Sequence, residues 1–550
     1  GEDALAGTTT GSNNVAIGLD ALKANTTGTG NIGIGRRALD ANTDGSLNVA
    51  LGQSALGANT TADANTAIGY AALNVNTTGT KCVAVGAYAL DANTTADSNT
   101  AIGYQSLSAN TTGYQNTAVG EQSLILNTTG YRNTAIGFES LEDNTTGNYN
   151  SGLGYGSLAS NTTADYNVAI GYETLKVNTT GAQNAAVGAH ALDANTTGNY
   201  NIAMGVNALG GNTSASGNTA LGFQSMLANT TGGENVAVGA YALDANTTAS
   251  ANTAVGYNCL SSNTTGALNT GVGRECLIEN TTGDHNTAMG VECLKENTTA
   301  DDNSAFGYFA LRANTTGANN TAVGMEALKS NTTASNNTAV GMEALKTNTT
   351  GYQNTAVGKD ALNDNTTGAF NTAVGHNALA VNTTANSNTA VGNACLDANT
   401  TGAENTAVGQ GALTSNTTAS HNTAIGSNAL LSNTTGGSNV AIGHDCMEST
   451  NSSDNVAVGH EAMKSNSTGD KNTAIGWQAM TANTTGDRNT AVGYGALDAN
   501  TTGALNTAIG YNSMANGGGG AQQNCACGME TLRDVTTGEV NTAIGRSAGE

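Results

Sequence analysis

Eight cysteines, six histidines and a recurring aspartate are the residues of this chain whose side chains could do chemistry. Thiolates and imidazoles bind zinc or act in redox and nucleophilic reactions when their spacing lets them meet. Five cysteines share one position of a short repeat, where most copies have Ala, so we interpret them as small buried residues. Neighbouring copies would place three of them about 5 Å apart, near disulfide range but with poor bridge geometry. The five are Cys259, Cys276, Cys293, Cys395 and Cys446.

The other candidate residues also lack the spacing that a reactive site needs. Cys525-Ala526-Cys527 has one residue between its thiols where a redox or zinc motif has two, and it replaces ordinary residues of the repeat. We therefore expect a structural role for this pair as well. The histidines occupy unrelated positions of the repeat, and no two of them have metal-ligand spacing together with a repeating carboxylate. They are His190, His285, His376, His421, His444 and His460.

Acidic residues are frequent, but their pattern indicates neither a metal site nor a catalytic pair. Asp91, Asp193, Asp244 and Asp498 each precede Ala-Asn in a turn of the repeat, where we interpret them as solvated charges. The glycine-rich calcium repeat and the EF-hand spacing are both absent. A polysaccharide-cleaving enzyme would need a local cluster of acids and bases that breaks the repeat, and the sequence has none. We predict no cofactor, no metal and no catalysis.

The element that must hold all these residues is a 17-residue repeat. Aligned on a recurrent Asn, the repeat runs from Asn14 to Asn541 in 32 copies, and a typical copy spans residues 116–132. Self-similarity at a fixed short period is the signature of a solenoid. We therefore treat residues 1–550 as a single continuous array, which starts and ends within a copy.

A few places depart from the period. Cys82 replaces the recurrent Asn once. One residue is deleted in the copy at residues 439–455, and one is inserted in the copy at residues 506–524. The insertion coincides with the glycine run of residues 516–520, which has no titratable group, so we predict a bulged loop there.

Composition supports an ordered repeat and excludes several classes of function. Gly numbers 73, Pro is absent and charged residues are only 11% of the chain, so neither a wide globular core nor ordinary disorder fits. The formal net charge of −24 opposes binding to nucleic acid or to an anionic membrane surface. No apolar run approaches the roughly 18 to 20 residues that span a bilayer. No signal peptide opens the chain, so any targeting segment is expected to have been removed or to lie outside it.

Each copy predicts two short extended runs separated by two turns. Thr-Ala-Val at residues 117–119 favours β structure and ends at Gly120, which suits a corner with positive φ, as does Gly103 one copy earlier. An Ala-Leu pair forms the second run in most copies, and Asn-Thr-Thr-Gly supplies the next turn. A helix is disfavoured because the turn residues leave no segment of roughly ten residues. The predicted fold is all-β, a parallel β-solenoid of about 32 coils, on the order of 150 Å long.

The apolar positions predict both a core and a partner surface. The expected core residues of the typical copy are Ala118, Val119 and Leu124. Ala118 and Val119 are consecutive, so they point to opposite faces of a strand, and one face would line the lumen while the other needs a partner. Parallel association of identical rods, most simply a trimer, would supply that partner. The alternative is a flattened single-chain solenoid that wraps Leu around a corner.

The asparagines at the two turns have two interpretations. Asn99, Asn116, Asn110 and Asn127 are expected to hydrogen-bond in their turns and to stack from coil to coil as ladders. Asn110, Asn127 and Asn161 are also formal N-glycosylation sites, because each begins an Asn-Thr-Thr sequence. The ladder would bury these amides, whereas glycosylation would need them exposed.

Three segments resemble a known family: Asn14-Val15-Ala16-Ile17-Gly18, Asn116-Thr117-Ala118-Val119-Gly120 and Asn201-Ile202-Ala203-Met204-Gly205. With the Ala or Ser that follows, they are similar to the head repeats of YadA-like trimeric autotransporter adhesins and to repeats of phage and bacterial tail fibres. The resemblance covers essentially the whole chain and implies a left-handed, trimeric β-roll on a cell or virion surface. The unit here is longer near Asn-Thr-Thr-Gly. No anchor, coiled-coil stalk or chaperone domain is recognisable, which indicates a fragment or a processed shaft.

The predicted function is therefore that of an extracellular structural and adhesive shaft, in a surface adhesin, a virion tail fibre or a filament. Its expected partners are further copies of itself, with host surfaces or glycans touching variable turn residues such as Tyr131-Arg132. An alternative function is ice or mineral-surface binding by Thr and Asn arrays. Thr128-Thr129 disfavours it, because these residues are adjacent in a turn and do not alternate along one strand face.

Overall fold

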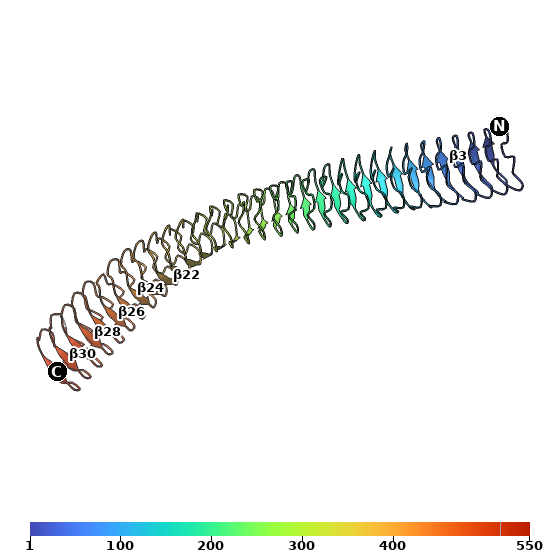
Figure 1. Ribbon diagram of the computed structural model, residues 1–550. Coiled ribbons are helices and arrows are strands. Elements are labelled where there is room, and N and C mark those ends of the chain that lie inside the picture. Colours follow the sequence, from blue (N-terminus) through green and yellow to red (C-terminus); the bar gives the residue numbers. More distant parts are fainter. Residues whose placement is uncertain (518, 550) are drawn as a thin grey trace. The chain divides into compact units, whose positions relative to one another are not determined.

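The computed structural model describes residues 1–517 and 519–549, and its only regular elements within those residues are β-strands. The chain divides into two compact units, Gly1–Arg274 and Glu275–Glu550. Each unit is a parallel β-solenoid in which one coil takes about 17 residues, so the predicted fold class is confirmed. Figure 1 shows the strand arrows of successive coils lying side by side along each unit.

The first unit contains sixteen strands of three residues each. Neighbouring strands are parallel and paired with a shift of one copy, so that Ala101, Ala118 and Ala135 lie in one row. This register places equivalent residues of all copies in columns along the unit. The strands are β1 (Val15–Ile17), β2 (Ile32–Ile34), β3 (Val49–Leu51), β4 (Thr66–Ile68), β5 (Val83–Val85), β6 (Thr100–Ile102), β7 (Thr117–Val119), β8 (Thr134–Ile136), β9 (Ser151–Leu153), β10 (Val168–Ile170), β11 (Ala185–Val187), β12 (Ile202–Met204), β13 (Thr219–Leu221), β14 (Val236–Val238), β15 (Thr253–Val255) and β16 (Thr270–Val272).

The second unit repeats the same arrangement with sixteen further strands. Thr338, Thr355 and Thr372 illustrate its register, since each lies opposite the next in the sheet. The strands are β17 (Thr287–Met289), β18 (Ser304–Phe306), β19 (Thr321–Val323), β20 (Thr338–Val340), β21 (Thr355–Val357), β22 (Thr372–Val374), β23 (Thr389–Val391), β24 (Thr406–Val408), β25 (Thr423–Ile425), β26 (Val440–Ile442), β27 (Val456–Val458), β28 (Thr473–Ile475), β29 (Thr490–Val492), β30 (Thr507–Ile509), β31 (Cys525–Cys527) and β32 (Thr542–Ile544).

Each coil has one strand. The prediction of a second extended run, made from the sequence, is therefore wrong. After β7, residues 121–126 form a continuous turn in which Gln122 and Leu124 have φ of +57° and +52°. The Gln122 N–H donates to the Tyr104 carbonyl of the preceding coil, whereas the Leu124 N–H donates to the Ser140 carbonyl of the following coil. Left-handed φ costs an L-residue roughly 1–2 kcal/mol. Bonds to both neighbouring coils and burial of the leucine offset that cost.

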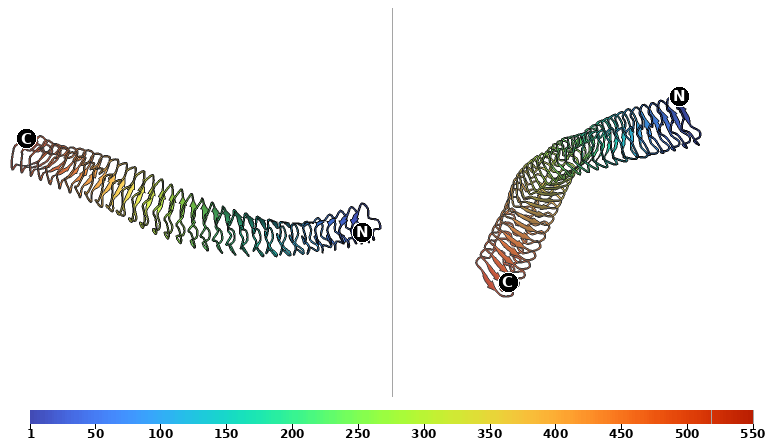
Figure 2. Two further views of the ribbon diagram at one scale, coloured as in Figure 1. Left: turned by 90° about the horizontal axis from the view of Figure 1, so that it is seen from above. Right: turned by 45° about the vertical axis from the view of Figure 1, so that its right-hand side comes forward.

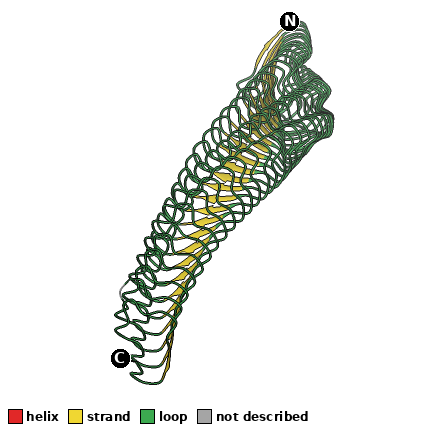
Figure 3. Cartoon of the chain, turned by 90° about the vertical axis from the view of Figure 1, so that its left-hand side faces the viewer, coloured by secondary structure: helices red, strands yellow, loops and turns green. Residues whose placement is uncertain are grey.

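The strands line one side of the coils and the turns close the other side, as Figure 2 and Figure 3 show. The interior between them is narrow and mixes small apolar residues, leucine and asparagine. In the typical coil Asn116, Ala118, Ser123, Leu124 and Asn127 are all fully buried. A single coil with so few large apolar groups is weak alone, so stability must come from stacking of each coil against the coils before and after it.

Both irregular copies keep the strand register. Val440 pairs with Val456 across the one-residue deletion, and Thr507 pairs with Cys525 across the one-residue insertion. In the shortened coil the buried hydroxyl of Ser452 accepts a hydrogen bond from the Asn466 amide at 2.7 Å. The length change is therefore absorbed in the turn. Gly518, at the centre of the predicted bulged loop, lies outside the described residues.

Candidate functional site: buried amide ladders and an uncharged outer stripe

Two columns of asparagine amides run through the interior of the coils. In the first ladder the Asn116 N–H donates to Asn99 Oδ1 at 2.9 Å, and Asn116 Nδ2 donates to the Gly130 carbonyl at 2.8 Å. In the second ladder Asn127 Nδ2 donates to Asn110 Oδ1 and to the same Gly130 carbonyl, both at 2.9 Å. These amides have no exposed surface, so water cannot satisfy their donors and acceptors. The hydrogen bonds within and between coils satisfy them instead.

The ladders contradict glycosylation at the three sequons. Asn110, Asn127 and Asn161 are fully buried, and the Nδ2 atom of each donates two hydrogen bonds. A glycan is attached through Nδ2, which no enzyme or sugar could reach in the folded coil. The Asn-Thr-Thr sequence is therefore a structural turn here.

The corner glycine closes each strand against the next coil. Gly103 and Gly120 have φ of +139° and +138°, a region that L-residues rarely adopt. A Cβ on Gly120 would also overlap the carbonyl group of Gly137 in the following coil. The two requirements, a special φ and a close backbone approach, are met only by glycine.

The predicted core residues separate into two environments. Ala118 and Leu124 face the interior and are fully buried. Val119 lies on the outer face of the sheet and is only partly buried in the single chain, so its assignment to the core differs from the structure. Thr117 shares the outer face with Val119, because alternate residues of a strand point to the same side.

We call the outward-facing first and third residues of all the strands the outer stripe. In each unit it continues from coil to coil, and no charged residue occurs in either of its columns. Many of its side chains are exposed, for example Met204 at 47% and Val340 at 37%. Scattered apolar residues are normal on a protein surface, but a continuous apolar stripe marks a contact surface. The stripe is the outward face of the sheet, opposite the face that lines the interior.

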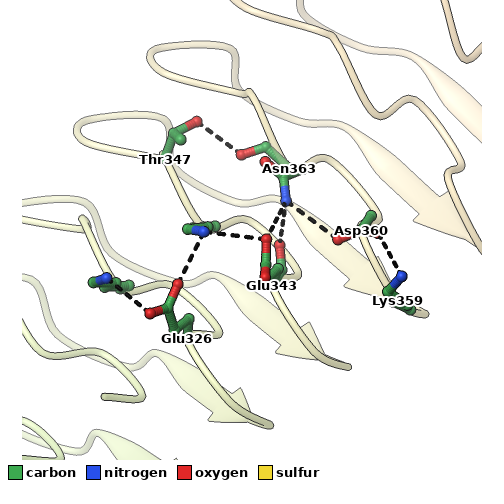
Figure 4. Close-up of polar contacts among 8 residues, drawn as sticks. Glu326, Glu343, Thr347, Lys359, Asp360 and Asn363 are labelled. Carbon is green, nitrogen blue, oxygen red and sulfur yellow. Dashed lines mark hydrogen bonds and ion pairs between the residues drawn. The ribbon is translucent and has the colours of Figure 1, made fainter. Parts of the chain in front are cut away.

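The charged residues lie on the turns beside the stripe, where several form ladders of ion pairs. Lys346 bridges Glu326 of the preceding coil at 2.9 Å and Glu343 of its own coil at 3.1 Å. Figure 4 labels the two glutamates of these pairs. Asn363 then continues the contacts to Glu343 and Asp360. The hydrogen bond from Lys346 is the main cause that holds the pKa of Glu326 below its usual value. Such surface pairs contribute little individually, about 0–1 kcal/mol.

Exposed rings form a second kind of ladder next to the corner glycines. His444, His460, Trp477, Tyr494 and Tyr511 occupy one column, and successive ring centroids are 5.2, 4.8, 6.3 and 5.4 Å apart. His444 and His460 are therefore not at unrelated positions, because the deletion between them hides their common column. The rings pack against one another, which is worth about 0.5–1.5 kcal/mol per pair beyond burial.

The recurring aspartates, predicted from the sequence to be solvated, are partly buried in the turns. Desolvation by burial is the main cause that raises the pKa of these carboxyl groups, which are Asp91, Asp193, Asp244 and Asp498. Within the described residues the Oδ1 atoms of Asp91 and Asp244 have no hydrogen-bond partner. No group of three or more Cys, His, Asp or Glu side chains in that part of the chain could hold a metal ion. The carboxylates are isolated from one another and form no site.

The cysteines divide into six buried thiols and an outward pair. Cys259, Cys276, Cys293, Cys395 and Cys446 line the interior as small residues, and Cys82 replaces an amide of the first ladder. Burial raises the pKa of the Cys395 and Cys446 thiols to about 12, which removes their reactive thiolate form. Cys525 and Cys527 occupy the outer stripe, where Cys527 is exposed and Cys525 is partly buried. They do not replace interior residues.

Thiol labelling should distinguish the two groups. In the reduced, folded single chain, N-ethylmaleimide is expected to modify Cys525 and Cys527 within minutes and to leave the six buried thiols intact, as read by peptide mass spectrometry. Denaturant should make all eight thiols reactive. Fast labelling of Cys446 in the native protein would contradict its interior position.

No protein-family model and no curated protein matches the chain. The described residues also contain no helix with the length and apolarity needed to cross a bilayer.

Proposed function

We propose that this protein is the structural and adhesive shaft of an extracellular fibre, on a cell surface, a virion or a secreted filament. The observation that carries the proposal is the outer stripe, an uncharged surface that continues from coil to coil in each unit. A shaft needs stiffness and lateral cohesion rather than a pocket. Repeated coils with internal amide ladders would supply the stiffness, and the stripe would supply the cohesion.

Parallel copies in contact along their outer stripes, most simply as a trimer, are the assembly that we propose. Identical stripes are self-complementary, and each coil adds the same small apolar contact, so the association strengthens with length. The charged residues, which give the chain its net charge of −24, lie outside the stripe and would face solvent in such a bundle.

The exposed turns would carry adhesion. Tyrosines such as Tyr155 and Tyr172 are 44% and 50% exposed in successive coils, and their rings stack with centroids 5.3 Å apart. Many weak contacts to a glycan or a host surface, repeated along a bundle, would give avidity without a single binding pocket.

The proposal is tested by placing charges in the stripe. Replacing Val340 and Val357 together by Asp should leave the fold intact, because both side chains point outward, and should convert the bundle into single chains. Circular dichroism would report the fold, and analytical ultracentrifugation the number of chains per particle. We expect at least a tenfold weakening of association, since two desolvated charges cost well over 1.4 kcal/mol per contact.

The control adds one charge outside the stripe, in the coil that contains Val340. Thr350 is exposed in the turn, so Thr350→Asp should change neither the fold nor the assembly. A wild-type protein that sediments as a single chain at micromolar concentration would end the proposal of lateral association.

Ice or mineral-surface binding is the second candidate, and one observation favours it. The seven strands β19 to β25 all have Thr first and Val or Ile third, so hydroxyl and aliphatic groups form two outward columns. They repeat at about 4.8 Å along the sheet and about 6.8 Å across it. Thr128-Thr129 lie in a turn and are not part of this array, which the strands alone form. Thermal hysteresis of the purified protein would support the second candidate, whereas its absence would exclude ice binding.

A further inference from the structure

Cys525 and Cys527 are the first and third residues of β31 and therefore point out of the coil on the same side. All other cysteines of the chain are fully buried. The outward pair occurs in one coil only, where most other coils have Thr or Val first and Val or Ile third. The outer stripe thus contains two neighbouring thiols at a single height.

Neither thiol has a disulfide partner in its own chain. The in-register neighbours are Thr507 and Ile509 on β30 and Thr542 and Ile544 on β32. Within β31 the two Cα atoms are separated by two residue rises, about 6.8 Å, and the Cβ atoms are directed in parallel. Disulfides need Cβ atoms about 3.5–4.5 Å apart, so a bridge between Cys525 and Cys527 would distort the strand.

We propose that Cys525 and Cys527 form disulfides between copies of this chain and fix the register of the bundle. This inference rests on the proposed lateral association through the outer stripe. The stripe repeats every coil, so identical chains could slide past one another by whole coils with little change in contact. A thiol pair at one height removes that freedom, because the bonds form only when the β31 strands of all copies lie at the same level.

The number of thiols also has a consequence. A chain with one outward thiol could bond to at most one neighbour and would not go beyond a covalent dimer. With two, Cys525 can bond to Cys527 of one neighbouring copy while Cys527 bonds to Cys525 of another, which closes a covalent ring of three chains.

The bond forms by thiol–disulfide exchange with a small disulfide such as oxidised glutathione. The Cys525 thiolate attacks the reagent, which gives a mixed disulfide and releases one glutathione thiolate; the Cys527 thiolate of a second copy then attacks the Cys525 sulfur and releases the other. Two protein thiols lose two protons and are oxidised to one disulfide, while one oxidised glutathione is reduced to two glutathione molecules. Extracellular compartments maintain such bonds.

The experiment oxidises the reduced full-length chain with oxidised glutathione and resolves it on a denaturing gel without reductant. We expect the main band to match the covalent ring, with the same number of chains as the reduced particle has in analytical ultracentrifugation. Cys525→Ser removes one partner of every Cys525–Cys527 bond, so this variant and the double serine variant should both give single chains. Cys446→Ser is the matched control, because its thiol is buried, and should behave as wild type.

The outcomes separate this inference from the proposed function. If the double serine variant associates in ultracentrifugation but the wild type gives only single chains on the gel, or carries a disulfide within one chain, the inference is wrong and the shaft proposal stands. If reduced wild type and double serine variant are both single chains in solution, the lateral association itself fails. A continuous covalent ladder without a preferred size would also overturn the inference, because it means that the chains do not share one register.

Discussion

Replacing Asn127 by Asp is expected to open the coils on either side of it. The carboxylate would keep the bond from Asn144 Nδ2 but would face two acceptors, Asn110 Oδ1 and the Gly130 carbonyl, in a site with no solvent access. Each lost buried bond costs about 1–3 kcal/mol, and the buried charge adds to that, so we expect about 4 kcal/mol or more. Hydrogen exchange should show protection in residues 110–144 falling about a thousandfold.

The loss of stability in Asn127→Asp should depend on pH and should be larger at neutral pH than in acid. Burial beside acceptors would raise the pKa of the introduced carboxyl above its unfolded value of about 3.9, because the charged form is the one that the folded state disfavours. The penalty is therefore largest at neutral pH and shrinks as the pH falls toward 4. Thr129→Asp adds the same charge to an exposed position of the turn and should leave exchange rates within threefold of wild type. Equal effects of the two variants would refute the buried ladder.

Gly120→Ala should have an effect of similar size for a different reason. The φ of +138° is strained for alanine at a cost of about 1–3 kcal/mol, and the added Cβ would overlap the Gly137 carbonyl. The strand on one side must shift to relieve the overlap, so we expect about 3–5 kcal/mol of local destabilisation in total. Hydrogen exchange of β7 and β8 would measure it, because a long repeat array does not unfold in one step.

Gly156→Ala is the matched control for the corner glycine. Gly156 has a φ of +57°, and the nearest atom to an added Cβ is the Glu173 Cγ at 3.7 Å. Its column holds Gln122 in the typical coil at the same φ. We expect a change below about 1 kcal/mol. A large loss at Gly156 with none at Gly120 would mean that overlap with the next coil is not what selects glycine at the corner.

The sequence alone predicts the period, the strand at residues 117–119, the corner glycine and the asparagine ladder. These follow from local chemistry: β-branched residues favour strands, glycine permits positive φ, and a polar residue repeated in register can bond to its own copy. Because the sequence repeats at a fixed period, a correct prediction for one coil applies to the other coils of the same unit.

The turn at residues 121–126 could not be predicted in the same way. Leu124 adopts a left-handed conformation that single-residue preferences oppose, and only bonds to the coils before and after it make that conformation favourable. Val119 points outward because it follows the interior residue Ala118 in the strand, where successive side chains lie on opposite faces. Non-local contacts decided the conformation of Leu124.

The hydrogen bonds that join one ladder asparagine to the next share one direction. Asn133 donates its N–H to Asn116 Oδ1, and Asn144 donates its amide to Asn127 Oδ1, so in these bonds the donor belongs to the later coil and the acceptor to the earlier one. A folded coil therefore presents free amide oxygens to whichever segment the ribosome delivers next. Because domains fold from the amino-terminal side during synthesis, each finished coil would act as a template for its successor. The direction of these bonds favours folding of one copy at a time, in the order in which the copies are translated.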